Sequence, residues 1–219
     1  MMKKTMEIGV IGLGKFGSQF GATLVELGHK VIGVDGDQAK ARAAQEMLTT
    51  VYVADATDKA ALLQLGFGDL DAVAVSVGGS METSILITLN LQELGVENII
   101  AKAVSPAHRK VLERIGANQV IQPEADVAAH TAYRLSNPGL LDFLPIGEGV
   151  LIQERTVNAW AGKTLVDLNL RTKNGILVAA VCKGNGEEFS FVPNPGVPFD
   201  EGDKVLLIGN RSDVEKLQT

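Results

Sequence analysis

The sequence predicts an α/β protein in which a doubly wound parallel sheet is followed by a small α+β domain. Three observations lead to this prediction. Short apolar, β-branched runs alternate with amphipathic segments through residues 7–124, as expected for parallel strands covered by helices on both faces. A glycine-rich segment joins the first apolar run to the first amphipathic segment. After residue 149 the sequence consists of apolar runs separated by turn-rich segments.

The first part of the chain is expected to contain strands and helices in regular alternation. Strands are expected at residues 7–11, 31–34, 51–53, 72–75, 99–101 and 119–121, and helices at 16–27, 38–47, 59–65, 81–94 and 106–115. Several of the helical segments are followed by glycine, the residue that most easily adopts the left-handed conformation after a helix. Such a series of units forms a complete Rossmann-like domain.

The remaining chain is expected to form a smaller domain after a connecting segment. A helix is expected at 124–135, ended by Asn137-Pro138-Gly139. Beyond it, strands are expected at 151–157, 176–182, 189–192 and 204–208, and short helices at 163–168 and 212–217. The predicted organisation is therefore a nucleotide-binding domain at 1–124, a crossover helix and linker at 125–148, and a small α+β regulatory domain at 149–219.

Composition excludes several classes of protein. The formal net charge is −6, and the basic residues are not clustered as they are in proteins that bind nucleic acid non-specifically. No apolar run approaches the roughly 18 residues of a membrane-spanning helix. No signal-peptide pattern follows Met1, so we expect an intracellular protein. The single cysteine, Cys182, excludes an intramolecular disulfide, and its apolar sequence context indicates a buried side chain.

The glycine-rich segment, GLGKFG at residues 12–17, has the context of a dinucleotide-binding loop. Gly12 permits the tight turn, Gly14 lets the backbone approach a pyrophosphate, and Gly17 lets the helix pack close to the strand. Amides at the helix N-terminus attract phosphate charge. Asp35 ends the second strand, where its carboxylate can accept hydrogen bonds from a ribose and disfavours the 2′-phosphate of NADP. The alternative is a degenerate domain with an empty site.

The sequence contains no recognisable catalytic set. His108 and His130 lack a nearby serine, cysteine or metal-ligand partner, and His29 directly follows a glycine expected to end a helix. We therefore expect structural or surface roles for all three. Nucleotide binding alone does not identify a reaction. The enzymatic alternative is an NAD-dependent oxidoreductase, which the glycine segment and Asp35 favour. The small second domain and the missing acid–base set disfavour it.

Several segments together resemble the RCK (KTN) domain family, whose members regulate potassium channels and transporters. The chain is most similar to the stand-alone cytosolic subunits of bacterial Ktr/Trk-type potassium uptake systems. The segments that carry the resemblance are VIGLGKFG at 10–17, VD at 34–35, DAT at 55–57, LERIGA at 112–117, QPEAD at 122–126, LNLR at 168–171 and EGD at 201–203. The glycine segment is widespread among proteins, whereas the DAT segment followed by IGA and PE is much more specific.

The resemblance implies a cytoplasmic regulatory subunit that binds ATP or ADP, with NAD(H) as a further ligand, and performs no chemistry. It implies a homo-oligomeric ring of paired subunits, often eight, docked at the inner face of the membrane beneath a potassium-translocating partner. The implied cofactor-binding residues are Gly12, Gly14, Lys15, Phe16, Gly17, Asp35, Asp55, Ala56, Thr57, Val77, Gly78, Lys102 and Glu124. An NAD(H) redox sensor is the third interpretation of the same site.

Within this set the resemblance implies distinct roles. Asp55 and Ala56 border the adenine, residues 77–78 lie beside the adenosine, and Lys102 follows the fifth strand at the ligand-binding edge of the sheet. Glu124 matches a position that reaches a γ-phosphate or its divalent metal ion from a neighbouring subunit. The alternative for Glu124 is an acidic residue stabilised by the dipole of its own helix.

Lys15 departs from the family pattern, because uptake regulators commonly carry arginine at this position of the loop. Lysine keeps the charge but lacks the planar, bidentate donor pair. We therefore expect phosphate attraction to persist, while discrimination of ATP from ADP is left open. The alternative is a solvated surface lysine.

The resemblance also implies that the second domain can bind cyclic di-AMP at a dimer interface. Arg171 would face a phosphate, and Val192 and Pro193 would supply apolar contacts. The alternatives are a rigid turn at 193–198 and an apolar dimer surface without a ligand.

Overall fold

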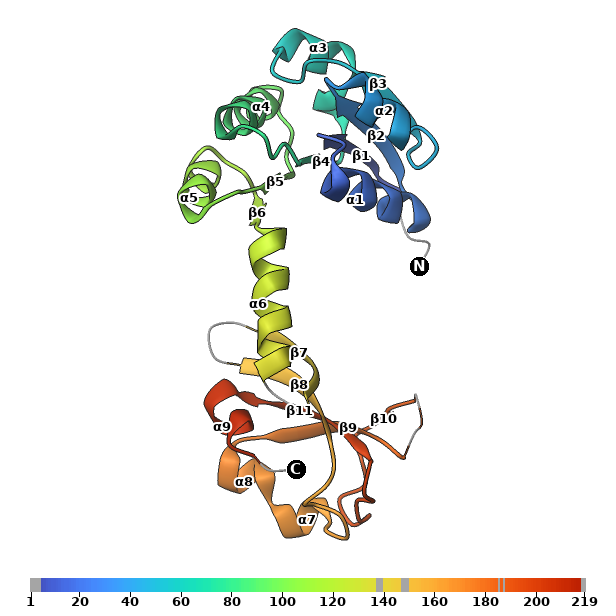
Figure 1. Ribbon diagram of the computed structural model, residues 1–219, viewed down its shortest axis with the longest axis vertical. Helices are drawn as coiled ribbons and strands as arrows, with labels where there is room; N and C mark the ends of the chain where they lie inside the picture. The colour runs from blue at the N-terminus through green and yellow to red at the C-terminus, as the bar shows by residue number, and fades with distance from the viewer. Residues whose placement is uncertain (1–4, 137–139, 147–149, 185, 187, 218–219) are drawn as a thin grey trace. The chain divides into compact units, whose positions relative to one another are not determined.

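The computed structural model describes residues 5–136, 140–146, 150–184, 186 and 188–217 (Figure 1). The chain divides into two compact units, Met1–Asp126 and Val127–Thr219, which are described separately as the first and second unit. The predicted fold class is confirmed, because the first unit has a parallel sheet with helices and the second has a small antiparallel sheet with short helices.

The sheet of the first unit has the strand order β3-β2-β1-β4-β5-β6. Its strands are β1 (Glu7–Ile11), β2 (Lys30–Asp35), β3 (Thr50–Val53), β4 (Ala72–Val75), β5 (Ile99–Lys102) and β6 (Gln119–Ile121). All are parallel, and β1 pairs with both β2 and β4. The direction in which strands are added therefore reverses beside β1, as in Rossmann-like sheets.

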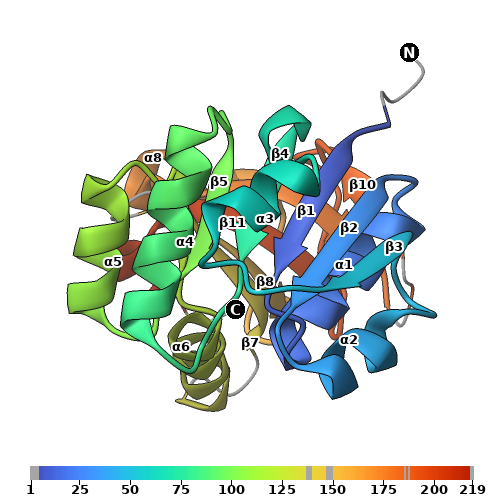
Figure 2. The ribbon, with the colours of Figure 1, turned by 90° about the horizontal axis from the view of Figure 1, so that it is seen from above.

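Helices cover both faces of this sheet. They are α1 (Lys15–Glu26), α2 (Gln38–Ala44), α3 (Lys59–Gln64), the 3-10 turn η1 (Phe67–Asp69), α4 (Met81–Glu93) and α5 (Pro106–Arg114). A further helix, α6 (Pro123–Ser136), begins in the first unit and continues into the second. Figure 2 shows α4 alongside β5, α5 alongside α4, and α2 alongside β2 and β3.

The alternation of side chains along β1 creates a core on each face. Val10 is fully buried in the cluster beneath α1 and α2, whereas the adjacent Ile11 is buried in the cluster beneath α3, α4 and α5. Phe67 and Leu112 belong to the second of these clusters. A strand buried on both faces reads as a continuous apolar run, which is why β1 was predictable from the sequence.

The second unit contains an antiparallel sheet with the order β10-β9-β11-β8-β7. Its elements are β7 (Leu140–Ile146), β8 (Val150–Thr156), α7 (Leu165–Leu168), α8 (Leu170–Asn174), β9 (Leu177–Cys182), β10 (Ser190–Phe191), β11 (Lys204–Asn210) and α9 (Arg211–Glu215). Trp160 and Phe199, with ring centroids 6.0 Å apart, pack with Val205 and Leu207 in its core.

Two elements of the second unit were not anticipated from the sequence. Strand β7 lies in the segment expected as a crossover helix and linker. It is an edge strand, the position in a sheet that tolerates a proline such as Pro145. Helix α8 follows α7 after Asn169, whose left-handed backbone (φ 47°) ends one short helix and begins the next. Among the described residues, no helix is both long and apolar enough to cross a membrane.

Candidate functional site

The main cleft of the first unit lies at the carboxyl ends of β1 to β4 and has a volume of about 570 Å³. Because the strand order reverses beside β1, the loops after β1 and β4 diverge and leave a crevice between them. Of the residues predicted to bind a cofactor, the structure places these in the lining: Gly12, Gly14, Asp35, Asp55, Ala56, Thr57, Val77 and Gly78.

Glycine is needed at the three positions of the loop for different structural reasons. Gly12 has φ +91°, and a Cβ there would lie 2.9 Å from the backbone of Ser76. A Cβ on Gly17 would lie 1.9 Å from the carbonyl oxygen of Gly12, so α1 can approach the loop only with glycine at this position. A Cβ on Gly14 would meet no atom within 4 Å. The open space at Gly14, in the lining of the cleft, is where a ligand can come close to the backbone.

The N-terminus of α1 differs from those of the next four helices. Helices α2, α3, α4 and α5 are capped by side chains that accept hydrogen bonds from first-turn amides, namely Asp37, Asp58, Ser80 and Ser105. Helix α1 begins after Gly14, which has no side chain, and no acidic residue stands in its first turn. Its first-turn N–H groups and helix dipole are therefore available to an anion.

Asp35 holds the loop in place. Its Oδ2 accepts a hydrogen bond from the Leu13 N–H at 2.7 Å, and its Oδ1 accepts one from the Asp37 N–H at 2.8 Å. The carboxylate thus joins the end of β2 to the glycine loop and to the turn before α2. Each carboxylate oxygen can accept more than one hydrogen bond, so capacity for ribose hydroxyls remains.

The segment after β3 is ordered by its own side chains. Asp55 Oδ1 accepts hydrogen bonds from the Thr57 hydroxyl at 2.7 Å and from the Thr57 N–H at 2.9 Å, and these donors lower the pKa of the Asp55 carboxyl. Asn90 of α4 donates to the Thr57 carbonyl at 2.9 Å. This turn forms one wall of the cleft and keeps a negative charge there.

The other predicted cofactor residues lie outside the cleft lining. Gly17 packs beneath the loop, Lys15 is exposed, and the ring of Phe16 stacks on Phe20 with centroids 5.8 Å apart. Lys102 and Glu124 form an ion pair in an adjoining hollow of about 300 Å³, which shares Gly78 with the cleft. The structure therefore divides the predicted site into two neighbouring spaces.

Sequence reasoning missed three polar residues of the cleft lining: Lys40, Ser76 and Thr83. Lys40 lies in the first turn of α2, and Thr83 lies in the first turn of α4, where its N–H donates to the Ser80 hydroxyl. A usable signal was available, because the first turns of helices that follow strands face the ligand edge of such a sheet. Neither residue belongs to a recognisable motif.

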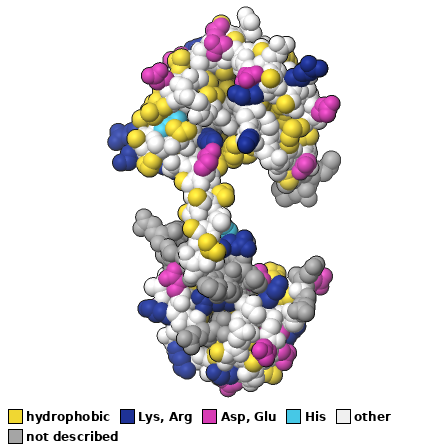
Figure 3. All heavy atoms as spheres, viewed as in Figure 1, with side chains coloured by type: hydrophobic (Ala, Val, Ile, Leu, Met, Phe, Trp, Pro, Cys, Tyr) yellow, Lys and Arg dark blue, Asp and Glu magenta, His cyan; other side chains and the backbone are white. Residues whose placement is uncertain are grey.

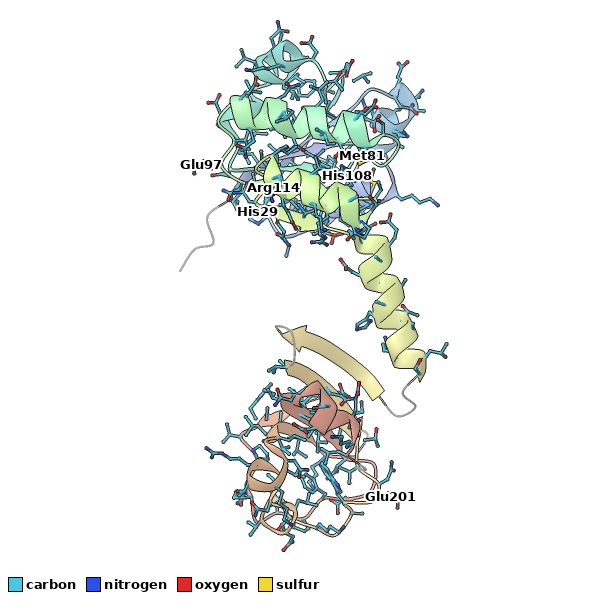
Figure 4. All side chains as sticks on the ribbon, turned by 90° about the vertical axis from the view of Figure 1, so that its left-hand side faces the viewer. His29, Met81, Glu97, His108, Arg114 and Glu201 are labelled. Carbon is cyan, nitrogen blue, oxygen red and sulfur yellow. The ribbon has the colours of Figure 1, made fainter. Side chains whose placement is uncertain are left out.

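His29 and His108 each accept a hydrogen bond from a backbone N–H group. His29 Nδ1 accepts a hydrogen bond from the Met6 N–H at 3.2 Å. His108, on α5 next to α4 (Figure 4), is fully buried, and its Nδ1 accepts one from the Val104 N–H at 3.3 Å. Cys182 is buried and donates to the Gly186 carbonyl. In the described part of the chain, no three or more His, Cys, Asp or Glu side chains group as metal ligands.

In the second unit the structure separates the residues predicted to bind a ligand. Arg171 is exposed and lines a hollow of about 140 Å³, whereas Pro193 lines another of about 220 Å³. Leu165 contributes to both hollows. Val192 is 89% exposed and has φ +54°, an unusual conformation for a β-branched residue.

Two family models match the chain. The TrkA-N domain model matches residues 8–123, and the TrkA-C domain model matches residues 152–219. Over 218 residues the chain is 35% identical to Ktr system potassium uptake protein C of Bacillus subtilis, covering 99% of this chain and 97% of that protein. It is 31% identical over 204 residues to Ktr system potassium uptake protein A of Vibrio alginolyticus, covering 93% and 92%.

Solved structures share the fold. The RCK domain of GsuK gives a TM-score of 0.66 at 20% identity, over 98% of this chain and 47% of that chain. The GsuK channel bound to NAD gives 0.68 at 20% identity, over 97% and 39%. The fold of the chain is therefore similar to that of these RCK structures.

Proposed function

The chain belongs to the RCK family, whose members join a TrkA-N domain to a TrkA-C domain, and we propose that it is the cytosolic regulatory subunit of a potassium uptake system. In this proposal it gates a membrane potassium-translocating partner in response to bound ATP or ADP and catalyses no reaction. One observation supports the ligand class above all others: the cleft meets the uncapped N-terminus of α1 at a glycine that leaves open space.

The residues of the cleft fit an adenine nucleotide. Gly14 and the first-turn amides of α1 would hold phosphates, and Asp35 would accept from ribose hydroxyls. The segment with Asp55 and Ala56 would border the base. The phosphate end of the cleft thus supplies donors, and the ribose end supplies acceptors, in the order that a nucleotide requires.

The regulatory signal would be the terminal phosphate. A ligand that binds two conformations equally well shifts neither, so ATP and ADP can have different effects only through the group that distinguishes them. We assign Lys15, Lys102 and Glu124 to this group, with a divalent cation at Glu124. A coupling free energy of about 1–3 kcal/mol is typical of such regulation.

We propose that the protein is a homo-oligomer, and an octameric ring is the arrangement that the family resemblance implies. Large apolar side chains of α4 and α5 are exposed in the isolated chain, namely Met81, Leu86 and Leu89 on α4 and Val111 on α5. Hydrophobic side chains are visible over this side of the first unit in Figure 3. A second copy of the chain would remove this apolar surface from water.

NAD(H) is the second candidate ligand, because Asp35 also suits the ribose of a dinucleotide. An NAD(H) sensor and an NAD-dependent oxidoreductase are the corresponding alternative functions. Turnover of NAD with a panel of small hydroxy acids would identify the oxidoreductase. Preferential binding of NAD or NADH without turnover would identify the sensor.

For the second unit we propose cyclic di-AMP as a ligand. The support is the exposed guanidinium of Arg171 beside a small hollow, together with the apolar hollow that Pro193 lines. Arginine is well suited to phosphate because its guanidinium donates two parallel hydrogen bonds. Titration of the full chain with cyclic di-AMP, compared with Arg171→Ala, tests this assignment.

The deciding experiment measures competition among ATP, ADP, NAD and NADH for the full chain, together with potassium flux through the membrane partner. We expect ATP and ADP to displace each other and to produce different fluxes. Tighter binding of NAD or NADH than of either adenine nucleotide would overturn the ATP/ADP assignment. Equal flux with ATP and ADP would overturn the gating mechanism.

A further inference from the structure

Ser76 is a buried polar residue of the cleft whose hydroxyl has no role in the packing of the first unit. It follows β4, lines the cleft and is only 8% exposed. Its backbone N–H donates to the Ile11 carbonyl at 2.7 Å, but among the described residues its hydroxyl has no hydrogen-bond partner. Buried hydroxyls normally have a partner, because they have lost most of their contact with water. A ligand or solvent in the cleft must therefore supply one.

The register of the sheet places this hydroxyl across the glycine loop from Asp35. On its two sides, Ile11 of β1 pairs with the residue before Asp35 in β2 and with the residue before Ser76 in β4. Asp35 and Ser76 therefore flank Gly12, and a Cβ on Gly12 would lie 2.9 Å from the Ser76 backbone. The proposed ribose acceptor stands on one side of the loop, and the unpartnered hydroxyl stands on the other.

Ser76 also faces the N-terminus of α1. Side chains alternate along β4, so that Val75 packs beneath α3, α4 and α5, whereas Ala74 packs beneath α1 and α2. Ser76 continues on the side of Ala74, and a Cβ on Gly17, in the first turn of α1, would lie 3.3 Å from the Ser76 Cβ. An anion held by the uncapped amides of α1 would therefore meet the hydroxyl from the side of β4.

From this geometry we infer that Ser76 binds the diphosphate of the nucleotide by donating a hydrogen bond from its hydroxyl to a phosphate oxygen. Phosphate oxygens only accept, and a hydrogen bond to an ionised acceptor is stronger than one between neutral groups. The inference rests on the proposed nucleotide site and adds to it a side chain that the glycine pattern does not contain. Because ATP, ADP and NAD(H) share a diphosphate, Ser76 contributes to the affinity for all of them and does not discriminate among them.

The test measures by calorimetry how ADP, 2′-deoxy-ADP and 3′-deoxy-ADP bind to the full chain and to Ser76→Ala. We expect the substitution to weaken binding of all three ligands about tenfold, the loss typical of a hydrogen bond to a charged group. The two deoxy ligands lack one ribose hydroxyl each, so an equal loss with all three means that the Ser76 hydroxyl does not contact either ribose hydroxyl. The ligand-free variant should unfold at the same temperature as the unsubstituted chain or at a higher one, since it loses a hydroxyl without a protein partner.

Ser84→Ala is the matched control. Ser84 of α4 is fully buried, and its hydroxyl also has no partner among the described residues, but it does not line the cleft. Its substitution removes the same atom from a buried position, so it should not lower the unfolding temperature and should leave the affinity for ADP unchanged.

Each way in which the inference can fail has its own result. Unchanged ADP affinity in Ser76→Ala would mean that the hydroxyl contacts solvent alone, and the proposed nucleotide function would stand. A loss that disappears with one deoxy ligand would assign the hydroxyl to the ribose. A lower unfolding temperature of the ligand-free variant would show that the hydroxyl stabilises the fold and affects binding only indirectly. If the unsubstituted chain binds none of the three ligands, the proposed function fails together with the inference.

Discussion

Gly17 and Gly14 belong to one loop, but adding a side chain has a different effect at each position. We predict that Gly17→Ala destabilises the first unit by about 1–3 kcal/mol, the usual cost of overpacking, because its Cβ would lie 1.9 Å from the Gly12 carbonyl oxygen. Gly14→Ala is the matched control, since its Cβ would meet nothing within 4 Å. It should keep its stability and lose nucleotide affinity. Urea denaturation and ADP titration separate the two effects, and equal stability of the two variants would contradict the assignment.

His108 predicts how stability depends on pH. Burial lowers the pKa of its imidazole, so the unfolded chain takes up a proton more readily than the folded chain does. The contribution of His108 to stability is therefore fully present above the unperturbed pKa of about 6.5 and is lost as pH falls below it. His108→Gln, which can still accept from the Val104 N–H, should flatten this decline. The measurement is urea denaturation from pH 7 to pH 5, with His29→Gln as the control; an unchanged decline in His108→Gln would show that other groups cause it.

The residues predicted from the sequence are those whose roles are local. The turn at Gly12 and the carboxylate of Asp35 follow from short-range spacing between a strand and a helix, and both lie where the pattern predicts. Lys40 and Thr83 reach the cleft only because the sheet brings the first turns of α2 and α4 to the same edge. Nor could spacing reveal that Lys102 is nearly buried while its partner Glu124 is exposed, because burial depends on the packed fold.

At the scale of elements, the alternation of strands and helices in the first unit could be predicted because buried parallel strands are apolar on both faces. Strand β7 could not be predicted, since Pro145 and the sequence Asn137-Pro138-Gly139 are typical of a linker. Its assignment as a strand depends on its pairing with β8. The helix expected at 163–168 corresponds to α7 alone, and α8 was not expected. Asn169, with a left-handed backbone, separates the two short helices, and hydrophobic periodicity does not indicate such a break.

The strands β9 and β11 are joined at one end by an ion pair. Asp203 is fully buried, and its Oδ2 lies 2.8 Å from the Nζ of Lys183, which also donates to the Pro198 carbonyl and to Asp200. We predict that Lys183→Met destabilises the second unit by about 1.5–3 kcal/mol, since it removes a charged donor from a buried carboxylate that keeps its two backbone donors. Hydrogen exchange at β9 and β11 measures the loss. Lys204→Met is the control, because its ion pair with Glu154 is long, at 3.8 Å.

For the same ion pair we predict that stability is lost both at low pH, through Asp203, and at high pH, through Lys183. Burial alone would raise the pKa of Asp203, but the hydrogen bonds from Lys183 and from the Asp200 and Gly184 N–H groups outweigh it and lower that pKa. Stability from Asp203 is thus present above its unfolded pKa, about 3.9, and is lost as pH falls through the lower folded value. The pKa of Lys183 is raised, mainly by the hydrogen bond to Asp203, so its contribution is lost as pH rises through that higher value. In Lys183→Met both dependences should weaken together; an acid dependence as large as that of the unsubstituted chain would assign it to another carboxylate.

At the scale of the whole molecule, the proposed regulatory subunit would act by changing how copies of the chain contact each other or their partner. The exposed apolar side chains of α4 and α5 offer the surface for such contacts. We predict that Leu89→Glu together with Val111→Glu dissociates the oligomer, because a charge buried in an apolar interface costs several kcal/mol. Both positions are exposed in the isolated chain, so the first unit should remain folded and should still bind ADP. Sedimentation velocity gives the mass of the assembly, and Leu63→Glu, on the exposed face of α3, is the control. If Leu63→Glu lowers the mass equally, or if the double variant leaves it unchanged, the subunits meet through another surface than the exposed side chains of α4 and α5.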